Sequence, residues 1–317
     1  MIRLFFAILA ARIFACECLA QQAINYRPKV AEFGVENIVD YTTTSNSENQ
    51  GTASSEISRS QLIKTKLTLP LCLKDNKKCG IQLKYYEQQL NFDVGHEDTG
   101  DGLLSALNNK RFTSTGLRLF YQKNLSNKRQ FKLIAGSEMS SDIIGWNKHT
   151  TNHFISGFYS WKTSKNAEMG TGLAIRQVMG LTALYPVFIY KKNLNPRWTL
   201  NLLLPKSASI RYNANNSNFL IAKTKFRGWR YNLSNGLPEN NENLTIRRAD
   251  LQFSVAWERE IYDWLWFSVD VGYNKNLRYY ITEFGQRRRD AIADLRSRDA
   301  TYTKFSIFLV PPKKFYK

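Results

Sequence analysis

Apolar and polar residues alternate along both halves of the segment "LQFSVAWEREIYDWLWFSVDVGYN" (Leu251–Asn274). One set of positions is apolar: Phe253, Val255, Trp257, Leu265, Phe267, Val269, Val271 and Tyr273. The other set is polar: Gln252, Ser254, Glu258, Ser268, Asp270 and Asn274. A period of two is typical of a β-strand whose two faces meet different surroundings. We therefore predict two strands joined by a hairpin connection at "REIYD" (Arg259–Asp263).

The same period continues through most of the chain. It recurs in the segments 62–70, 80–87, 115–122, 130–138, 154–162, 169–177, 198–205, 209–214 and 303–309. Clusters rich in Asn, Ser, Gly and Pro separate these segments, as expected of turns. "GQRRRDAIADLRSRD" (Gly285–Asp299) instead has the composition of a helix. The sequence thus predicts one all-β domain of about 12–14 antiparallel strands, with one short helix in a loop.

Two architectures fit this pattern. In a soluble antiparallel sandwich the apolar faces meet in a core, whereas in a transmembrane β-barrel they meet lipid. The polar faces carry Gly, Ser, Asn, Asp and Lys, which suit a barrel interior, and only a closed sheet pairs every backbone group in hydrocarbon. We therefore expect an antiparallel transmembrane β-barrel. Aromatic residues near the predicted strand ends would form its interfacial girdles: Trp229, Tyr231, Tyr262, Trp264, Trp266, Tyr279 and Tyr280.

The N-terminus has the pattern of an export signal. Arg3 precedes the apolar run "LFFAILAA" (Leu4–Ala11), and Cys18-Leu19-Ala20 fits a cleavage site. We expect a signal peptide at residues 1–20 and a barrel domain at 21–317, located in the outer membrane of a Gram-negative cell. Attachment of lipid at Cys16 is the weaker alternative.

Cleavage would leave two cysteines, Cys72 and Cys79, on either side of the polar turn "LKDNKK". In an oxidising compartment they are expected to form a disulfide bond that closes a small loop. A metal site needs more ligands than these two cysteines supply. Two free thiols remain the alternative.

The predicted inward faces are rich in basic residues, in a chain whose formal net charge is +19. Glu258 and Asp270 are the clearest inward acids. Such an interior would favour anions through the field of its wall. The alternative is that these bases pair with acids on other strands or with a loop that plugs the barrel. The candidate lumen-facing residues are Lys64, Lys66, Lys84, Arg118, Lys132, Arg176 and Arg211.

Little in the sequence points to an enzyme. His149 and His153 would lie roughly 13 Å apart on an extended strand, which is too far for one metal ion, and His96 falls in a predicted loop. The acidic loop "GHEDTGDG" (Gly95–Gly102) offers Glu97, Asp98 and Asp101 as calcium ligands but lacks the EF-hand spacing. We expect no catalytic residue, no metal and no cofactor. An outer-membrane hydrolase is the least favoured class.

The block Phe154–Asn215, with its "YPVFIY" and "LLLPKSASIRY" runs, resembles a family of uncharacterised outer-membrane β-barrel proteins of Gram-negative bacteria. The resemblance implies a barrel, assigns no substrate, and implies outer-membrane lipid, lipopolysaccharide and the barrel-assembly machinery as partners. The chain departs from many such barrels because Lys317, and not an aromatic residue, is last. We expect a non-enzymatic channel or a structural or surface protein, without a nucleic-acid partner. The alternative is a soluble periplasmic β-protein that binds a lipid or a small ligand.

Overall fold

The structure is a computed structural model and describes residues 27–38, 41–47, 51–74, 76–93, 107–108, 110–234 and 244–313. The predicted signal peptide, Cys16 and the acidic loop at 95–102 lie outside these residues. The described elements are β1 (Ala31–Ile38), β2 (Tyr41–Ser47), β3 (Gly51–Lys74), β4 (Lys77–Asp93), β5 (Arg111–Ser126), β6 (Arg129–Ser141), β7 (Thr151–Ser164), β8 (Ala167–Val178), β9 (Leu181–Asn193), β10 (Trp198–Leu204), β11 (Ser207–Asn215), β12 (Asn218–Leu233), β13 (Leu244–Tyr262), β14 (Leu265–Glu283), the 3₁₀ helix η1 (Arg288–Asp290), β15 (Ala291–Ser297) and β16 (Ala300–Leu309).

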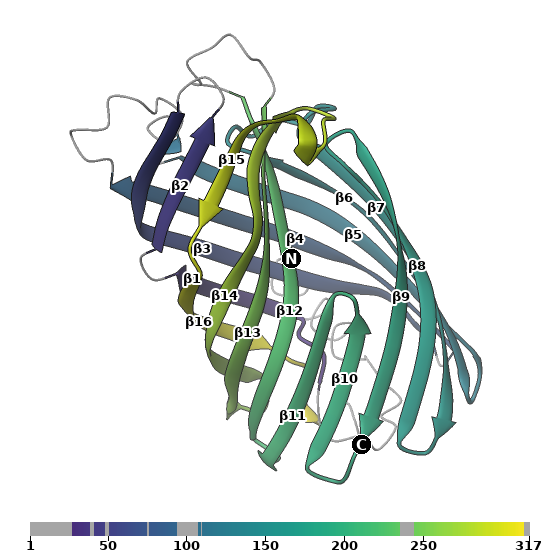
Figure 1. Cartoon of the computed structure of the whole chain (residues 1–317). Coiled ribbons are helices and arrows are strands. Elements are labelled where there is room, and N and C mark those ends of the chain that lie inside the picture. Colours follow the sequence, from purple (N-terminus) through teal and green to yellow (C-terminus); the bar gives the residue numbers. More distant parts are fainter. Residues whose placement is uncertain are drawn as a thin grey trace, which may run out of the picture.

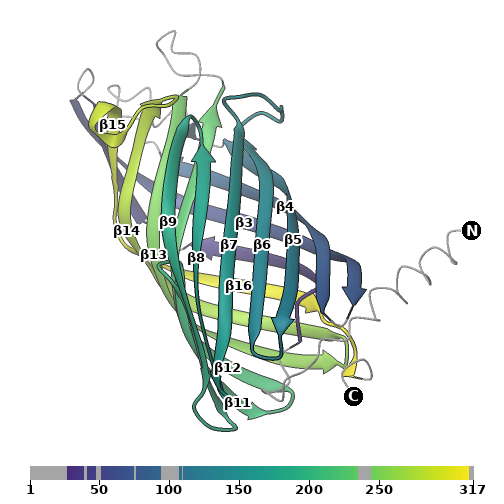
Figure 2. The same cartoon turned by 90° about the vertical axis from the view of Figure 1, so that its right-hand side faces the viewer.

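The strands form one closed antiparallel barrel with fourteen strand positions (Figures 1 and 2). The strands from β3 to β14 each pair with their neighbours in the chain. β1 and β2 share the first position because both pair with β3, and β15 and β16 share the last because both pair with β14. The β1–β16 and β2–β15 pairs close the ring. The predicted antiparallel barrel is confirmed, at the upper bound of the predicted strand number.

The period of two in the sequence separates the outer from the inner surface of the wall. Val255 and Val271 point outward and are 56% and 55% exposed, whereas Ser254 and Asp270 point inward and are 9% and 3% exposed. The same outward belt of exposed apolar side chains continues around the barrel, at Leu83, Leu119, Ile155, Leu173, Ile175, Leu220, Phe305 and Ile307. A continuous apolar outer face on a closed sheet is the surface that a membrane-spanning barrel presents to lipid.

The helix predicted at Gly285–Asp299 is wrong. Only η1 is helical there, and the following residues form β15. β15 pairs with β2 on one side and β14 on the other, and its Ala293 and Leu295 are each 1% exposed. The pairing partners on both sides override the helical composition of this segment. None of the helical residues described belongs to a helix long and apolar enough to cross a membrane.

The two ends of the barrel differ in their connections. The lower end in Figure 1 carries the short turns after β5, β7, β11 and β13, together with residues 27–30 and 310–313, which bind the β13–β14 turn. The upper end carries the β6–β7 connection (142–150), the β8–β9 turn (179–180) and η1. In outer-membrane barrels, short turns face the periplasm and longer loops face outside.

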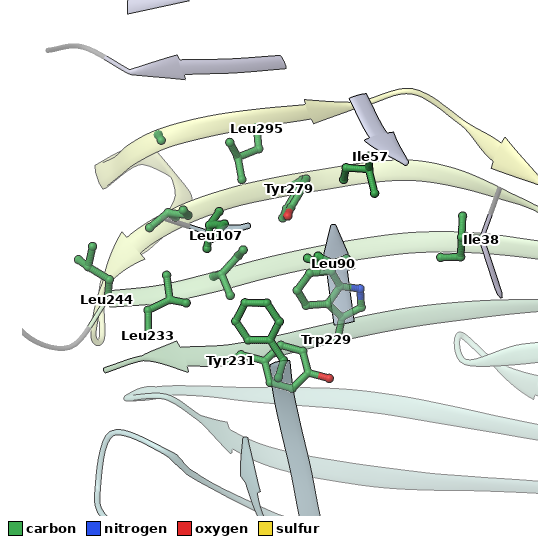
Figure 3. Packing of buried hydrophobic residues seen from close by; sticks show 14 of the residues in the cluster. Ile38, Ile57, Leu90, Leu107, Trp229, Tyr231, Leu233, Leu244, Tyr279 and Leu295 are labelled. Carbon is green, nitrogen blue, oxygen red and sulfur yellow. The ribbon is translucent and has the colours of Figure 1, made fainter. Parts of the chain in front are cut away.

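An apolar cluster fills the interior at the upper end (Figure 3). Trp229, Tyr231 and Tyr279 belong to it and are 9%, 3% and 1% exposed. Their placement in a predicted interfacial girdle is therefore wrong, as is that of Trp266, which packs inside the lower end against Phe219 and Phe308. Tyr262 and Trp264 do lie exposed at the lower rim. The cluster includes Ile38, Ile57, Leu90, Leu107, Phe112, Leu233, Leu244, Ile246, Ile281 and Leu295.

Candidate functional site

Buried carboxylates on β1 each bind two basic side chains inside the barrel. Glu36 accepts hydrogen bonds from Lys64 on β3 and Arg227 on β12. Glu32 lies 3.2 Å from Lys66 Nζ and 3.0 Å from Lys304 Nζ. These side chains converge because closure brings β1, β3, β12 and β16 around one interior. Each pairing offsets the cost of removing a charge from bulk water.

A third carboxylate, Glu138 on β6, has the same arrangement at a strand four positions along the wall from β1. Its two oxygens lie 2.5 Å from Lys84 Nζ on β4 and 2.6 Å from Arg176 Nη2 on β8. Both partners are two strands away from β6, so these ion pairs tie β4, β6 and β8 together across the inner face. Glu258 and Asp270, the acids predicted to face inward, pair with Lys29 and Lys223.

The strand register places all seven predicted basic residues on the inner face. Lys64, Lys66, Lys84 and Arg176 are in the ion pairs just described. Arg118 stacks over the Phe154 ring at 5.1 Å, and Arg211 lies 5.4 Å from the centre of the Phe219 ring. Pairing with acids on other strands, the alternative left open by the sequence, thus holds for at least Lys64, Lys66, Lys84 and Arg176. Glu32, Glu36 and Glu138 were not predicted as the partners.

Two further inner lysines lie in a surplus of positive charge. Lys206 is in the β10–β11 turn and Lys225 faces it on β12; both side chains are exposed. The charges that act on Lys225 are those of Lys64, Lys66, Arg227 and Lys206. Lys206 interacts with Arg118, Arg176 and Lys66, and with one carboxylate, Glu138.

We name Arg118, Lys132, Lys206 and Lys225 the inner cation cluster. Within the part of the chain that the structure describes, none of the four lies within ion-pair distance of a carboxylate. Lys132 interacts with Arg118 and, at longer range, with Glu168. Lys206 and Lys225 were missed because Lys206 lies in a turn and the strand Asn218–Leu233 was not among the predicted segments. The cluster is a region of the wall at which an anion would gain more attraction than in bulk solvent.

The two described histidines, His149 and His153, have unrelated surroundings. His149 packs edge-on against Phe284 with ring centres 4.6 Å apart, and His153 is exposed on β7. Across the described residues, no three His, Cys, Asp or Glu side chains are placed to hold a metal ion. His96, Glu97, Asp98 and Asp101 lie outside those residues, and the calcium alternative for that loop stays untested.

The predicted disulfide bond is confirmed. Cys72 on β3 and Cys79 on β4 are directly opposite in the register and are bonded, with their Cα atoms 5.0 Å apart. The bond staples the lower end of the β3–β4 hairpin, away from the inner cation cluster.

The barrel wall is interrupted between β9 and β12. β10 and β11 are short, so pairing of β9 with β10 stops at Phe188 and pairing of β11 with β12 stops at Lys225. Above these points β9 runs from Leu181 to Val187, and β12 from Phe226 to Leu233. Phe226 N donates a hydrogen bond to Lys206 O at 2.9 Å at the lower end of this stretch. Above it, Asn232 alone has a backbone partner among the described residues on the side of the interruption, in the β6 end at Ser141 and Asp142. Figure 1 shows β9 and β12 diverging above the β10–β11 hairpin.

We call this interruption the window. The free edges of β9 and β12 are its two lateral borders, and the turn that carries Lys206 is its lower border. Its upper border is formed by two contacts: Ser141 beside Asn232, and Gly285 N, which donates a hydrogen bond to Met179 O at 3.2 Å. At about 3.3 Å per residue, the free edge of β9 is roughly 20 Å long.

The two edges of the window do not lie in one surface. Arg230 is on the outer face of β12, yet it interacts with Arg176 of β8 and Tyr185 of β9, which are on the inner face. Arg247 on the outer face of β13 likewise reaches Met179 O at the β8–β9 turn. The inner face of β8–β9 therefore overlaps the outer face of β12–β13 at the upper end, and the window opens as a seam between them.

A family described as "Domain of unknown function (DUF6268)" matches residues 19–291 of the chain. No curated protein matches it. Among solved structures, a Pseudomonas aeruginosa FadL homologue is 9% identical, with a TM-score of 0.44 over 96% of each chain. An outer membrane channel from Pseudomonas putida F1 is 10% identical, with a TM-score of 0.40 over 90% of this chain and 97% of that one. The Pseudomonas putida toluene transporter TodX is 9% identical, with a TM-score of 0.39 over 92% and 93%.

Proposed function

We propose that this chain, which belongs to the DUF6268 family, is a non-enzymatic outer-membrane channel for anionic solutes. The observation that carries the proposal is the inner cation cluster on the inner face of a barrel whose outer face is an apolar belt. Such a belt suits a wall that lies in hydrocarbon, where closure of the sheet would satisfy its backbone. Among the described residues, the inner cation cluster would then attract an anionic solute inside the wall.

The pairing of charges sets which part of the interior selects anions. At Glu32, Glu36 and Glu138 each carboxylate cancels the charge of one of the two bases that it binds, so one positive charge per carboxylate remains there. The inner cation cluster has no such compensation. Anion preference should therefore depend more on each of these four residues than on Lys64, Lys66 or Lys84, because each of those three lysines shares a carboxylate.

Reversal of charge at the cluster tests this proposal. The double variant Lys206→Glu, Lys225→Glu should shift the reversal potential in a salt gradient from anion towards cation preference, because it replaces two attractive charges with two repulsive ones. The control is Lys128→Glu, Arg129→Glu, which makes the same change of charge in the exposed β5–β6 turn. Equal reversal potentials for the two variants would place Lys206 and Lys225 away from the permeation path.

A barrel that does not conduct and only anchors surface loops is the second candidate. The apolar cluster at the upper end favours it, because buried apolar side chains of β3, β4 and β5 meet those of β12, β13 and β14 inside the barrel. Absence of current and of solute flux in the wild-type protein, together with a folded barrel that changes its gel mobility on boiling, would establish this candidate. Unchanged mobility would instead support the soluble periplasmic protein.

A further inference from the structure

The free strand edges at the window are difficult to reconcile with contact with lipid tails. Backbone groups that face hydrocarbon without a partner are strongly unfavourable, and open sheet edges occur in membranes only where they line water or protein. Yet the apolar belt continues on both sides of the window: Ile175 pairs with Leu184 of β9, and Leu251 pairs with Phe226 of β12. Leu184 is 61% exposed and Phe226 is 46% exposed. The window thus lies at the depth of the belt and must hold polar material.

The surroundings of the window have two chemical characters. Its outer margin is apolar, with Leu184, Pro186 and Phe188 on β9, Leu204 on β10 and Phe226 on β12 exposed. Its lower border is cationic, because Lys206 and Lys225 point to the interior there and Arg230 lines the seam above them. A ligand matched to both would have a hydrocarbon chain on the membrane side and an anionic head on the inner side.

The seam also has room for a ligand. A side chain added at Gly228, on the outer face of β12 at the window, would find Arg248 O at 3.8 Å and nothing nearer. Tyr185 of β9, across the seam, keeps 40% of its surface exposed. The apolar cluster narrows the interior at the upper end, where Phe112 of β5 packs against Tyr231 of β12, and the window lies in the wall beside it.

We propose that the window is a lateral site for a single-chain anionic amphiphile, whose phosphate, sulfate or carboxylate head binds at Lys206 and Lys225 while its chain extends into the membrane. This inference rests on the proposed function and names its substrate class and its route. The amphiphile enters the interior sideways between β9 and β12.

A fluorescent reporter at the window tests the proposal. Tyr185→Cys carries a bimane label in the full chain with Cys16→Ser and Cys18→Ser, in which Cys72 and Cys79 are bonded to each other. Leu173→Cys, on the lipid-facing side of β8 and 57% exposed, reports quenching from the membrane alone. The probes are nitroxide-labelled dodecyl phosphate, a nitroxide-labelled dodecyl glycoside with a neutral head, and unlabelled inorganic phosphate as competitor.

Dodecyl phosphate should quench the Tyr185→Cys reporter at a concentration at least about tenfold lower than the neutral glycoside, and the two should quench Leu173→Cys alike. Lys206→Glu, Lys225→Glu should remove the tenfold difference. Gly228→Trp should weaken quenching by occupying the seam, while Gly157→Trp, on the outer face of β7 with nothing within 4 Å, should not.

Equal quenching of Tyr185→Cys by the two amphiphiles would overturn the proposal. Competition by inorganic phosphate at the same concentration as dodecyl phosphate would also overturn it, because the ligand would then be a free anion. If the wild-type protein passes no anion while the charge-dependent quenching persists, the proposed channel function fails and the amphiphile site stands. If anion flux persists and quenching shows no dependence on charge, the site fails alone.

Discussion

Single carboxylates organise the charge inside this barrel. Glu36, Glu32 and Glu138 each bind two bases and cancel the charge of one, so the positive charge read from the sequence is halved at these positions, whereas no carboxylate lies within ion-pair distance of the inner cation cluster among the described residues. Alternation along a strand identifies which residues face inward. It does not identify partners, because Lys84 and Glu138 are two strands apart and Glu36 and Arg227 are 191 residues apart.

Removal of one of these carboxylates should be costly. Glu138→Gln keeps the shape of the side chain but leaves Lys84 and Arg176 without their counter-charge, so the free energy of unfolding should fall by about 1–3 kcal/mol. Anion preference should rise in the same variant. Urea unfolding in lipid vesicles measures the first effect. Glu87→Gln is the control, since Glu87 accepts its bond from the exposed Tyr85; an equal loss in both variants would contradict the role of the ion pairs.

Pairs of glycine and phenylalanine shape the inner face of β4 to β8. Phe120 lies opposite Gly80, Phe154 opposite Gly136 and Phe158 opposite Gly172, and each ring covers its glycine. A cross-strand aromatic over a glycine restores packing that the glycine lacks and helps to fix the register. Phe154 in turn stacks with Arg118, so this packing also positions one member of the inner cation cluster.

A methyl group at Gly136 should disturb this arrangement. Its Cβ would lie 2.5 Å from the Phe154 ring and 2.7 Å from Leu117 O. Gly136→Ala should therefore destabilise the barrel by about 1–3 kcal/mol, because the ring and the strand must move apart. Gly157→Ala, which meets nothing within 4 Å, should be neutral or slightly stabilising. Equal unfolding midpoints for the two variants would show that the Gly136–Phe154 contact does not hold the sheet.

A strand is predicted correctly where its own residues carry the signal, and wrongly where residues distant in the chain decide its surroundings. β13 and β14 were predicted correctly because each outward position meets lipid and each inward one meets polar groups, so the period of two is strong. Trp229, Tyr231 and Tyr279 were misplaced because an aromatic residue near a strand end suits an interfacial girdle and an interior cluster equally. Ala291–Ser297 was misread as a helix because its strand pairing depends on β2, more than 240 residues away in the chain.

At the scale of the whole molecule, one closed sheet encloses three regions: an apolar cluster at the upper end, a charged interior below it, and the window in the wall beside it. The window follows from element lengths, since β10 and β11 are too short to reach the height of β9 and β12. The short segments 198–205 and 209–214 were visible in the sequence. Their effect on the wall was not visible, because the sequence does not show which neighbouring strands extend beyond them.

The most direct test of the account is the environment of consecutive residues along β13 and β14. Single cysteines from Gln252 to Trp257 and from Ser268 to Tyr273, each labelled with a polarity-sensitive dye in lipid vesicles, report lipid or water at each position. We expect blue-shifted emission, quenched by nitroxide-labelled lipid, at residues 253, 255, 257, 269, 271 and 273. Residues 252, 254, 256, 268, 270 and 272 should escape that quencher. Emission and quenching that do not alternate along the two strands would contradict a wall with lipid on one side and a polar interior on the other.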